Sequence, residues 1–214
     1  MLIPNSSRLR ILTLGATLGL LTGCGSSEPA LPKVRALTEA EANARTVVPL
    51  TRTVALDKPG VIADFEFDLL PPPAYTGPSV VIGIRLKEDE VRASEALNST
   101  VAREGLPAKV LLQRLEDGKA VDMALVRRVA DQRGTVPIGP DGFTPGPEHA
   151  GVNPQSLWDA GLMAEGALYN VRSFGSPGEA PPGRYRLRVE LLETRPSLRT
   201  ASAEIIVGYN SRAK

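Results

Sequence analysis

Hydrophobic and polar residues alternate strictly in two segments of this chain, 61–70 and 183–193. Side chains on a strand point alternately to its two faces, so this pattern predicts strands that are buried on one face and wet on the other. In the first segment, Phe65, Phe67 and Leu69 alternate with Asp64, Glu66 and Asp68. In the second, Tyr185, Leu187, Val189 and Leu191 alternate with Arg184, Arg186 and Arg188.

Shorter apolar runs bounded by turn residues predict further strands. These runs cover 47–56, 79–86, 108–115, 120–129, 167–174 and 199–209. Asp117-Gly118 lies between two of them, and Asp-Gly flanked by apolar segments is a strong signal for a two-residue hairpin. About eight short strands with little helix are typical of an antiparallel β-sandwich. We therefore predict an all-β sandwich over residues 46–210.

Three short helices are expected between the strands. Thr38 and Glu41 have the spacing of a capping box, which predicts a helical turn after Thr38. Charged residues at i, i+4 spacing predict a surface helix within 87–97. Asn153-Pro154 is expected to cap a third helix that reaches Trp158.

Residues 131–154 are rich in Gly and Pro and form the longest segment without periodicity. Loops of this length are either functional or disordered. Recognition residues of a sandwich usually lie on its loops, and aromatic side chains contribute much of the energy of protein interfaces. We expect a partner-binding site at Phe143, His149 and Trp158. The alternatives are that the loop has no role and that Trp158 belongs to the core.

The charged faces of the two alternating strands allow two interpretations. Asp64, Glu66 and Asp68 offer oxygen ligands for a cation, and the three arginines of the other strand offer donors for an anion. A straight strand lacks the tight loop that surrounds a calcium ion. We favour two solvated faces whose charges pair across the sheet.

The late alternating strand begins with Pro182-Gly183-Arg184-Tyr185. This start resembles the late strand of immunoglobulin-like domains, although the Cys-Trp-Cys core of true immunoglobulins is absent. The resemblance implies an immunoglobulin-like sandwich in the looser, architectural sense. The strand spacing of the C-terminal half is also similar to that of small bacterial lipoproteins of unknown function, some of which accompany interbacterial toxin systems.

The N-terminal residues have the parts of a secretion signal in the right order. Arg8 and Arg10 precede an apolar run over 11–22, which is shorter than the roughly 20 residues that cross a bilayer. Leu21-Thr22-Gly23-Cys24 then resembles the lipobox of bacterial lipoproteins, with Leu21, Thr22 and Gly23 as the signal peptidase motif. The resemblance implies cleavage before Cys24 and attachment of lipid to its thiol.

This resemblance implies an organisation for the whole chain. Residues 1–23 are expected to be a lipoprotein signal peptide, and residues 24–45 the lipidated cysteine and a flexible linker before the sandwich. The membrane is then one partner, through the lipid on Cys24. Gly25 stands where an Asp would commonly retain a lipoprotein at the inner membrane. We therefore expect the outer membrane, with the domain facing the periplasm.

Charge and composition exclude several other classes of protein. The chain has 25 Lys and Arg against 24 Asp and Glu, and a near-neutral surface gives no reason to expect a nucleic acid partner. Aromatic residues make up 4% of the chain, which argues against a sugar-stacking platform. His149 is the single histidine and has no cysteine near it, so we expect no metal. No nucleophile is paired with a base in a known motif, so we expect no enzyme and no cofactor.

Three functions remain open for this chain. We favour a membrane-anchored, non-enzymatic envelope lipoprotein that binds another protein or scaffolds an assembly. One alternative is an immunity lipoprotein that neutralises an interbacterial toxin. The other is a carbohydrate-binding or hydrolytic envelope protein, which the low aromatic content and the missing catalytic pair disfavour.

Overall fold

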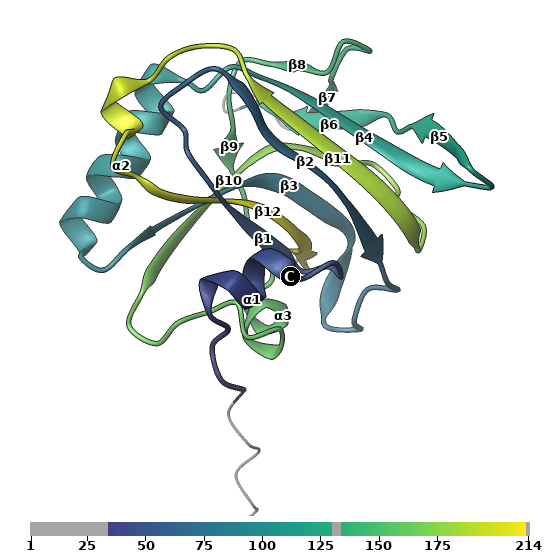
Figure 1. Cartoon of the computed structure of the whole chain (residues 1–214), viewed down its shortest axis with the longest axis horizontal. Coiled ribbons are helices and arrows are strands. Elements are labelled where there is room, and N and C mark those ends of the chain that lie inside the picture. Colours follow the sequence, from purple (N-terminus) through teal and green to yellow (C-terminus); the bar gives the residue numbers. More distant parts are fainter. Residues whose placement is uncertain (1–33, 130–133, 213–214) are drawn as a thin grey trace, which may run out of the picture. The chain divides into compact units, whose positions relative to one another are not determined.

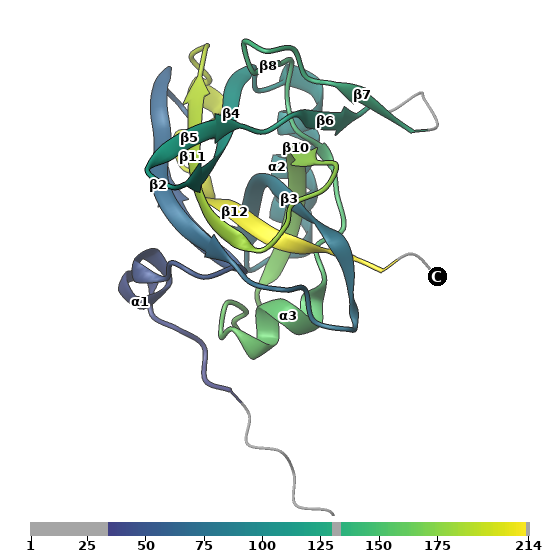
Figure 2. The ribbon, with the colours of Figure 1, turned by 90° about the vertical axis from the view of Figure 1, so that its right-hand side faces the viewer.

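Two antiparallel sheets pack on each other in a computed structural model that describes residues 34–129 and 134–212 (Figures 1 and 2). One continuous cluster of buried apolar residues draws on strands of both sheets. The expected all-β sandwich is thereby confirmed at the level of its architecture.

The first sheet has seven strands in the described part of the chain. Their order is β1, β12, β3, β10, β6 and β7, and β9 pairs with β10 beside this row. The strands are β1 (Leu50–Val54), β3 (Thr76–Glu88), β6 (Leu125–Arg128), β7 (Thr135–Pro137), β9 (Glu148–His149), β10 (Leu168–Pro177) and β12 (Ser202–Ser211).

The second sheet has five described strands. Their order is β2, β11, β4 and β5, and β8 also pairs with β4. The strands are β2 (Gly60–Leu69), β4 (Ala108–Glu116), β5 (Lys119–Asp122), β8 (Phe143–Thr144) and β11 (Gly183–Leu191). The predicted hairpin is confirmed: Glu116 pairs with Lys119, and Asp117 and Gly118 between them have φ of 47° and 77°. Positive φ at both central residues is what a type I′ turn requires.

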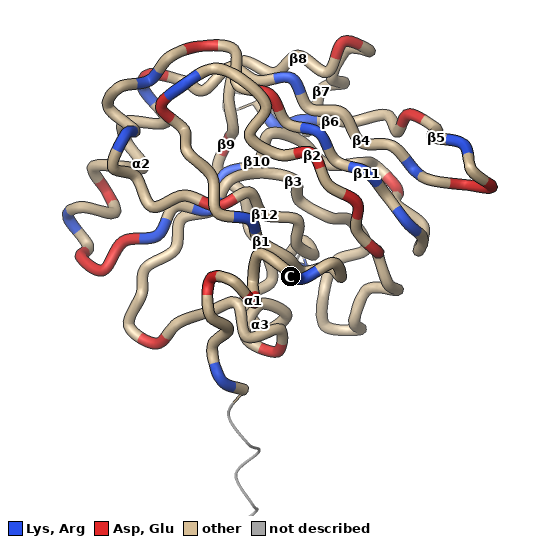
Figure 3. The backbone as a smooth tube through the Cα atoms, viewed as in Figure 1, with Lys and Arg blue, Asp and Glu red and all other residues tan. Residues whose placement is uncertain are grey.

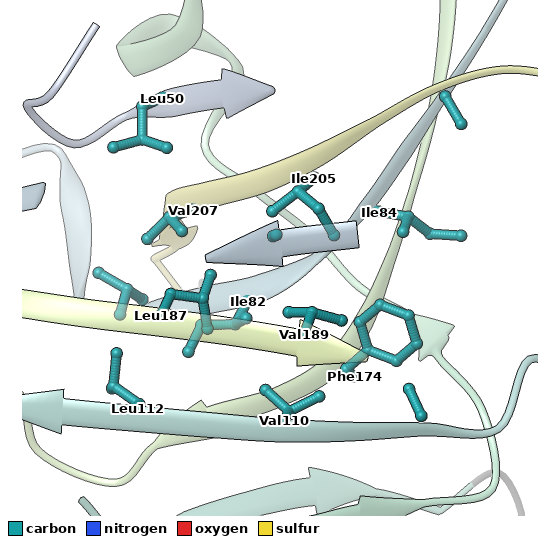
Figure 4. Packing of buried hydrophobic residues seen from close by; sticks show 14 of the residues in the cluster. Leu50, Ile82, Ile84, Val110, Leu112, Phe174, Leu187, Val189, Ile205 and Val207 are labelled. Carbon is teal, nitrogen blue, oxygen red and sulfur yellow. The ribbon is translucent and has the colours of Figure 1, made fainter. Parts of the chain in front are cut away.

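The core lies between the sheets, and Figure 4 shows its central side chains. Leu187 and Val189 of β11 and Val110 and Leu112 of β4 meet residues of the first sheet such as Ile82 there. The inward faces predicted from alternation are confirmed. Each fully buried Val or Leu contributes roughly 1.5–3 kcal/mol to stability, so this layer contributes much of the stability of the sandwich. Buried from the two alternating strands are Phe67, Leu69, Tyr185, Leu187, Val189 and Leu191.

Three helices pack on strands of the first sheet: α1 (Glu39–Ala44) on β1, α2 (Val91–Glu104) on β3 and β10, and α3 (Pro154–Asp159) on β12. A 3₁₀ turn spans Pro196–Leu198. The predicted caps are confirmed: Thr38 accepts from the Glu41 amide at 3.3 Å, and Asn153 accepts from the Ser156 amide at 2.9 Å. A second, smaller apolar cluster contains Ala42, Val81, Val152, Leu157, Leu162 and Ile206.

Residues 34–45 differ from the expected linker because they pack on the sandwich and belong to its compact unit. The Leu37 amide donates to the Gly161 carbonyl at 2.7 Å. Arg52 on β1 donates to the Ala42 carbonyl at 3.0 Å, which holds the C-terminal turn of α1. The segment has too few apolar residues for a periodic stripe, so its attachment by hydrogen bonds was not visible in the sequence pattern.

Two other segments also depart from the prediction. The expected strand over 120–129 is divided at Met123-Ala124, where the chain passes from β5 in the second sheet to β6 in the first. The described part of the expected loop 131–154 contains β7, β8 and β9, and these join both sheets. Strands of two or three residues are too short to show a hydrophobic period. Only pairing with a neighbouring strand identifies them.

Thr51 on β1 generates a stability prediction. Its side chain is fully buried, and its hydroxyl oxygen has no hydrogen-bond partner among the described residues. A buried polar group without a partner costs about 1–3 kcal/mol. We expect Thr51→Val to raise the free energy of unfolding by about 1 kcal/mol in denaturant titration. The matched control is Thr53→Val, at an exposed hydroxyl that accepts from Asn43, which should give no gain. A loss of stability in Thr51→Val would contradict the argument.

Candidate functional site

The outer face of the second sheet carries a ladder of opposite charges, formed by acidic residues of β2 and arginines of β11 (Figure 3). Arg186 donates to the two carboxylate oxygens of Asp64 at 2.8 and 3.0 Å. Arg188 reaches the same carboxylate at 3.2 Å, and Arg184 reaches Glu66 at 3.0 Å. The predicted pairing across the sheet is confirmed. The hydrogen bonds from Arg186, with the charges of Arg186 and Arg188, hold the pKa of Asp64 below its usual value.

The register explains how the ladder forms. Arg186 lies opposite Glu66 and Arg184 lies opposite Asp68, so each of these arginines bonds the acidic residue on the diagonal. Diagonal neighbours on one face of a twisted sheet lie within reach of long side chains. Exposed ion pairs contribute little to stability. What the ladder supplies is a regular pattern of charge on a broad face of the domain.

A groove of about 380 Å³ lies beside this face, along the outer edge of β4. Leu111 belongs both to the exposed outer face and to the groove. Residues from three parts of the chain surround the groove. They are Val110, Leu111 and Leu112 of β4; Asp122, Met123, Ala124 and Leu125 at the passage between the sheets; and Ile138, Gly139, Pro140 and Gly142 before β8.

The groove exists because β4 has two different neighbours on the same edge. β5 pairs with the C-terminal part of β4, and β8 pairs with its N-terminal part. Between them, the Val110 amide donates to the Gly142 carbonyl at 2.9 Å, and the Met123 amide donates to the Leu112 carbonyl at 2.8 Å. The two walls therefore leave β4 in different directions, and the space between them is open.

Gly142 fixes the position of one wall. Its φ is +73°, and a Cβ atom added there would lie 2.6 Å from the Val110 carbonyl oxygen. A side chain at this position would be strained by the backbone conformation and would push the wall away from β4. Most of the lining is apolar, and Asp122 is the charged residue among the lining side chains. The Asp122 carboxylate accepts from the side-chain amide of Gln113 at 2.8 Å. This hydrogen bond holds Asp122 at the end of the groove.

The structure separates the three residues expected to form a partner site. Phe143 lies on β8, directly after Gly142, and is 46% exposed. His149 lies on β9 opposite Arg172 of β10. Trp158 lies on α3, which Figures 1 and 2 place at the end of the domain away from β8. Only Phe143 is adjacent to the groove, so the three residues do not form one surface.

Trp158 is 41% exposed, which contradicts its interpretation as a core residue. The apolar side of α3 is formed by Leu157, which is buried in the smaller cluster. The lipobox residues Leu21, Thr22, Gly23 and Cys24 lie outside the described residues.

Two buried arginines on the first sheet were not expected from the sequence. Arg85 on β3 donates to Glu204 of β12 at 2.6 Å and to the Leu162 carbonyl at 2.6 Å, and its guanidinium lies 4.3 Å from the centre of the Tyr169 ring. The pair therefore fastens the segment after α3 to the sheet. A hollow of about 160 Å³ borders Glu204. Leu162, whose carbonyl Arg85 bonds, also lines this hollow.

Arg172 on β10 holds α2 in a similar way. Its side chain donates to Asn98 of α2 at 2.9 Å and to the Pro147 carbonyl at 3.0 Å. Burial lowers the pKa of its guanidinium. Beside it, Asn170 donates to Ser94 of α2 at 2.6 Å. Each of these contacts joins parts of the domain, so they favour a structural role over a binding one.

The fastening by Arg85 generates a prediction. Removing one charge of a buried pair leaves the other uncompensated and costs about 3–5 kcal/mol, whereas exposed pairs are worth little. We expect Glu204→Gln to lower the free energy of unfolding by about 3 kcal/mol. Glu66→Gln is the matched control, because it makes the same change in the exposed ladder and should leave stability nearly unchanged. Equal effects of the two variants in denaturant titration would show that Arg85 is not held by this pair.

The chain was also compared with known proteins. No family model matches it, and no curated protein matches it. Among solved structures, a crystal structure of a protein from Sulfurospirillum deleyianum is 9% identical, and the alignment covers 77% of this chain and 98% of that chain with a TM-score of 0.41. This level of similarity assigns neither a family nor an activity.

Proposed function

We propose that this chain is a lipid-anchored envelope protein whose sandwich domain binds another protein and catalyses no reaction. The observation that carries the proposal is the exposed outer face of the second sheet, where a regular charge ladder lies beside an apolar groove. Fixed charges give specificity to a protein interface, and a buried apolar centre supplies most of its affinity. The ladder offers the fixed charges and the groove offers the apolar centre, and both lie on the same side of the domain.

The anchor is part of the proposal through Leu21-Thr22-Gly23-Cys24. Two acyl chains suffice for stable attachment to a bilayer, so a lipidated Cys24 would need no membrane-spanning segment. No helix in residues 34–129 and 134–212 is long and apolar enough to cross a membrane. With Gly25 after the cysteine, we propose the outer membrane and a domain that faces the periplasm.

The immunoglobulin-like character of the sandwich is also proposed here. It is supported by Tyr185, whose hydroxyl donates to the Pro181 carbonyl at 2.6 Å. A buried tyrosine that bonds the backbone a few residues upstream is a feature of such domains. The strand order is different from that of the constant-type fold, in which the first two strands share a sheet, because β1 and β2 belong to different sheets here.

The anchor can be tested at Cys24. The thiol is the group that receives the lipid, so Cys24→Ala should leave the precursor uncleaved and unlabelled when cells are fed a palmitate analogue. The wild-type chain should be labelled and should fractionate with the outer membrane. Ser26→Ala, close to the cysteine but outside the motif, is the control and should be labelled like the wild type. Equal labelling of wild type and Cys24→Ala would reject the lipid anchor.

The protein-binding role can be tested by site-specific photo-crosslinking in cells. A benzoylphenylalanine at Leu111, on the outer face of the second sheet, should yield a crosslinked protein. Val91 on α2 is the matched control, because it is also an exposed apolar residue but lies on the side of the first sheet. We expect adducts from position 111 and none from position 91. Equal yields from both positions, or adducts from neither, would contradict the proposal.

Mass spectrometry of the adduct also separates the alternative functions. A secreted toxin as the adduct would favour immunity, whereas an envelope component would favour a scaffold.

A further inference from the structure

Exposed apolar side chains gather at one end of the domain. Nine large apolar residues are exposed in the part of the chain that the structure describes, and four of them belong to this end. Figures 1 and 2 show that their segments lie together: the start of the described chain, the turn between β2 and β3, and α3. We call these four residues the α3 surface. They are Val34, Leu70, Tyr75 and Trp158, each between 41% and 53% exposed.

Short contacts hold the three segments against each other. The Tyr75 hydroxyl donates to the Asp159 carboxylate at 2.5 Å, and the Asn153 side chain donates to the Tyr75 carbonyl at 3.1 Å. The turn after β2 is thereby fixed to α3. A Cβ atom added to Gly161, just after α3, would lie 2.8 Å from the Arg35 carbonyl oxygen. The start of the described chain therefore also lies against this end, and the three segments form one surface.

The composition of the α3 surface is typical of a membrane interface. Tryptophan and tyrosine combine an apolar ring with a polar atom, and they are enriched where bilayers meet water. Between Leu70 and Tyr75 the sequence is Pro71-Pro72-Pro73-Ala74, so no charged side chain separates these two residues. The Asp159 carboxylate, next to Trp158, accepts two hydrogen bonds from neighbouring side chains. Its charge is compatible with the level of the lipid headgroups.

The length of the chain before the domain indicates which end meets the bilayer. Val34 comes ten residues after Cys24, the proposed site of lipid attachment. Ten residues span at most about 35 Å, whereas a compact unit of the size of this domain is about 40 Å across. If the opposite end lay on the bilayer, Val34 would be farther from the lipid than the chain can reach. The end with the α3 surface is therefore the one that the tether holds near the membrane.

We propose that the α3 surface lies on the lipid bilayer, with Tyr75 and Trp158 at the level of the headgroups. This inference rests on the proposed function, since the lipid on Cys24 supplies the tether. A tethered group binds at a high effective concentration, so a contact of four side chains needs little affinity of its own. Figures 1 and 2 place β8 at the end of the domain away from α3, so the groove stays accessible to a partner.

The test uses the single tryptophan and the single cysteine of the chain, Trp158 and Cys24. The mature chain, residues 24–214, is coupled through Cys24 to a maleimide lipid in phosphatidylcholine vesicles that also contain a lipid with a spin label at its headgroup. We expect the emission of Trp158 to shift to shorter wavelength and to lose about half its intensity, because tryptophan at the interface lies within reach of the label. The coupling replaces the cellular lipid, so the result does not depend on whether cells lipidate Cys24.

A second reporter position is the control for simple proximity to the vesicle. The double variant Trp158→Phe, Phe143→Trp moves the tryptophan to β8, at a residue of similar exposure. Its emission should be neither shifted nor quenched. Equal quenching of both reporters would show that the domain meets the bilayer without a preferred side, and would overturn the inference.

Variants of the surface give a second measurement. Leu70→Glu adds a charge to the α3 surface and should remove most of the quenching of Trp158, because charged side chains are costly to place in lipid. Leu111→Glu makes the same change at an exposed residue on the outer face of the second sheet and should leave the quenching as in the wild type. Both residues are exposed, so the unfolding midpoints of the two variants should match. Equal quenching in the two variants would contradict the role of the surface.

The inference is overturned if Trp158 of the coupled chain is not quenched. If cells nevertheless label Cys24 with the palmitate analogue and position 111 yields a crosslinked protein, the proposed function stands and only the contact with the bilayer is rejected. A shift of the emission that appears without vesicles and grows with protein concentration would identify a second copy of the chain as the occupant. That result would also overturn the inference.

Discussion

Burial of β3 and β12 on both faces is the constraint on which the arrangement of the domain depends. Ile82 and Ile84 of β3 face the second sheet, while Val81 of the same strand and Ile206 of β12 belong to the smaller cluster on the opposite face. A sheet that is apolar on both faces needs a covering layer on each side. One side is covered by the second sheet, and the other by α1, α3 and the segment after α3. The segment after α3 is also held by a polar contact, because Arg85 pairs with Glu204 and donates to the Leu162 carbonyl.

The second sheet is under the opposite constraint. β2 and β11 alternate strictly, so one face completes the core and the other must be wet. A sheet face with exposed charged side chains needs no cover, because it offers no large apolar patch to water. The domain therefore has one covered and one open broad side. An interaction surface on the open side requires no rearrangement of the fold.

Much of this asymmetry could be predicted from the sequence, since it is local. The alternation in 61–70 and 183–193 identified strands with one wet face, and it placed Arg186 and Asp64 on a shared charged surface. The hairpin at Asp117-Gly118 and the caps at Thr38 and Asn153 also depend on neighbouring residues alone. What could not be predicted depends on contacts between distant segments. Arg85 is an isolated charge in an apolar run until Glu204, 119 positions later, lies beside it. The groove likewise needs three separate segments to meet at β4.

The segment that sequence reasoning selected as a binding loop contributes in a different way from the one expected. Its described part gives β7 and β9 to the first sheet and β8 to the second and forms one wall of the groove, instead of presenting Phe143 and His149 on one surface. A free strand edge is a hazard, because any extended chain can pair with it. β5 and β8 pair with the two ends of this edge of β4, and Gly142 and Met123 bond Val110 and Leu112 between them, so an extended chain finds no continuous edge to join. Gly142 contributes to this protection, since its close approach to the Val110 carbonyl brings one wall of the groove against β4.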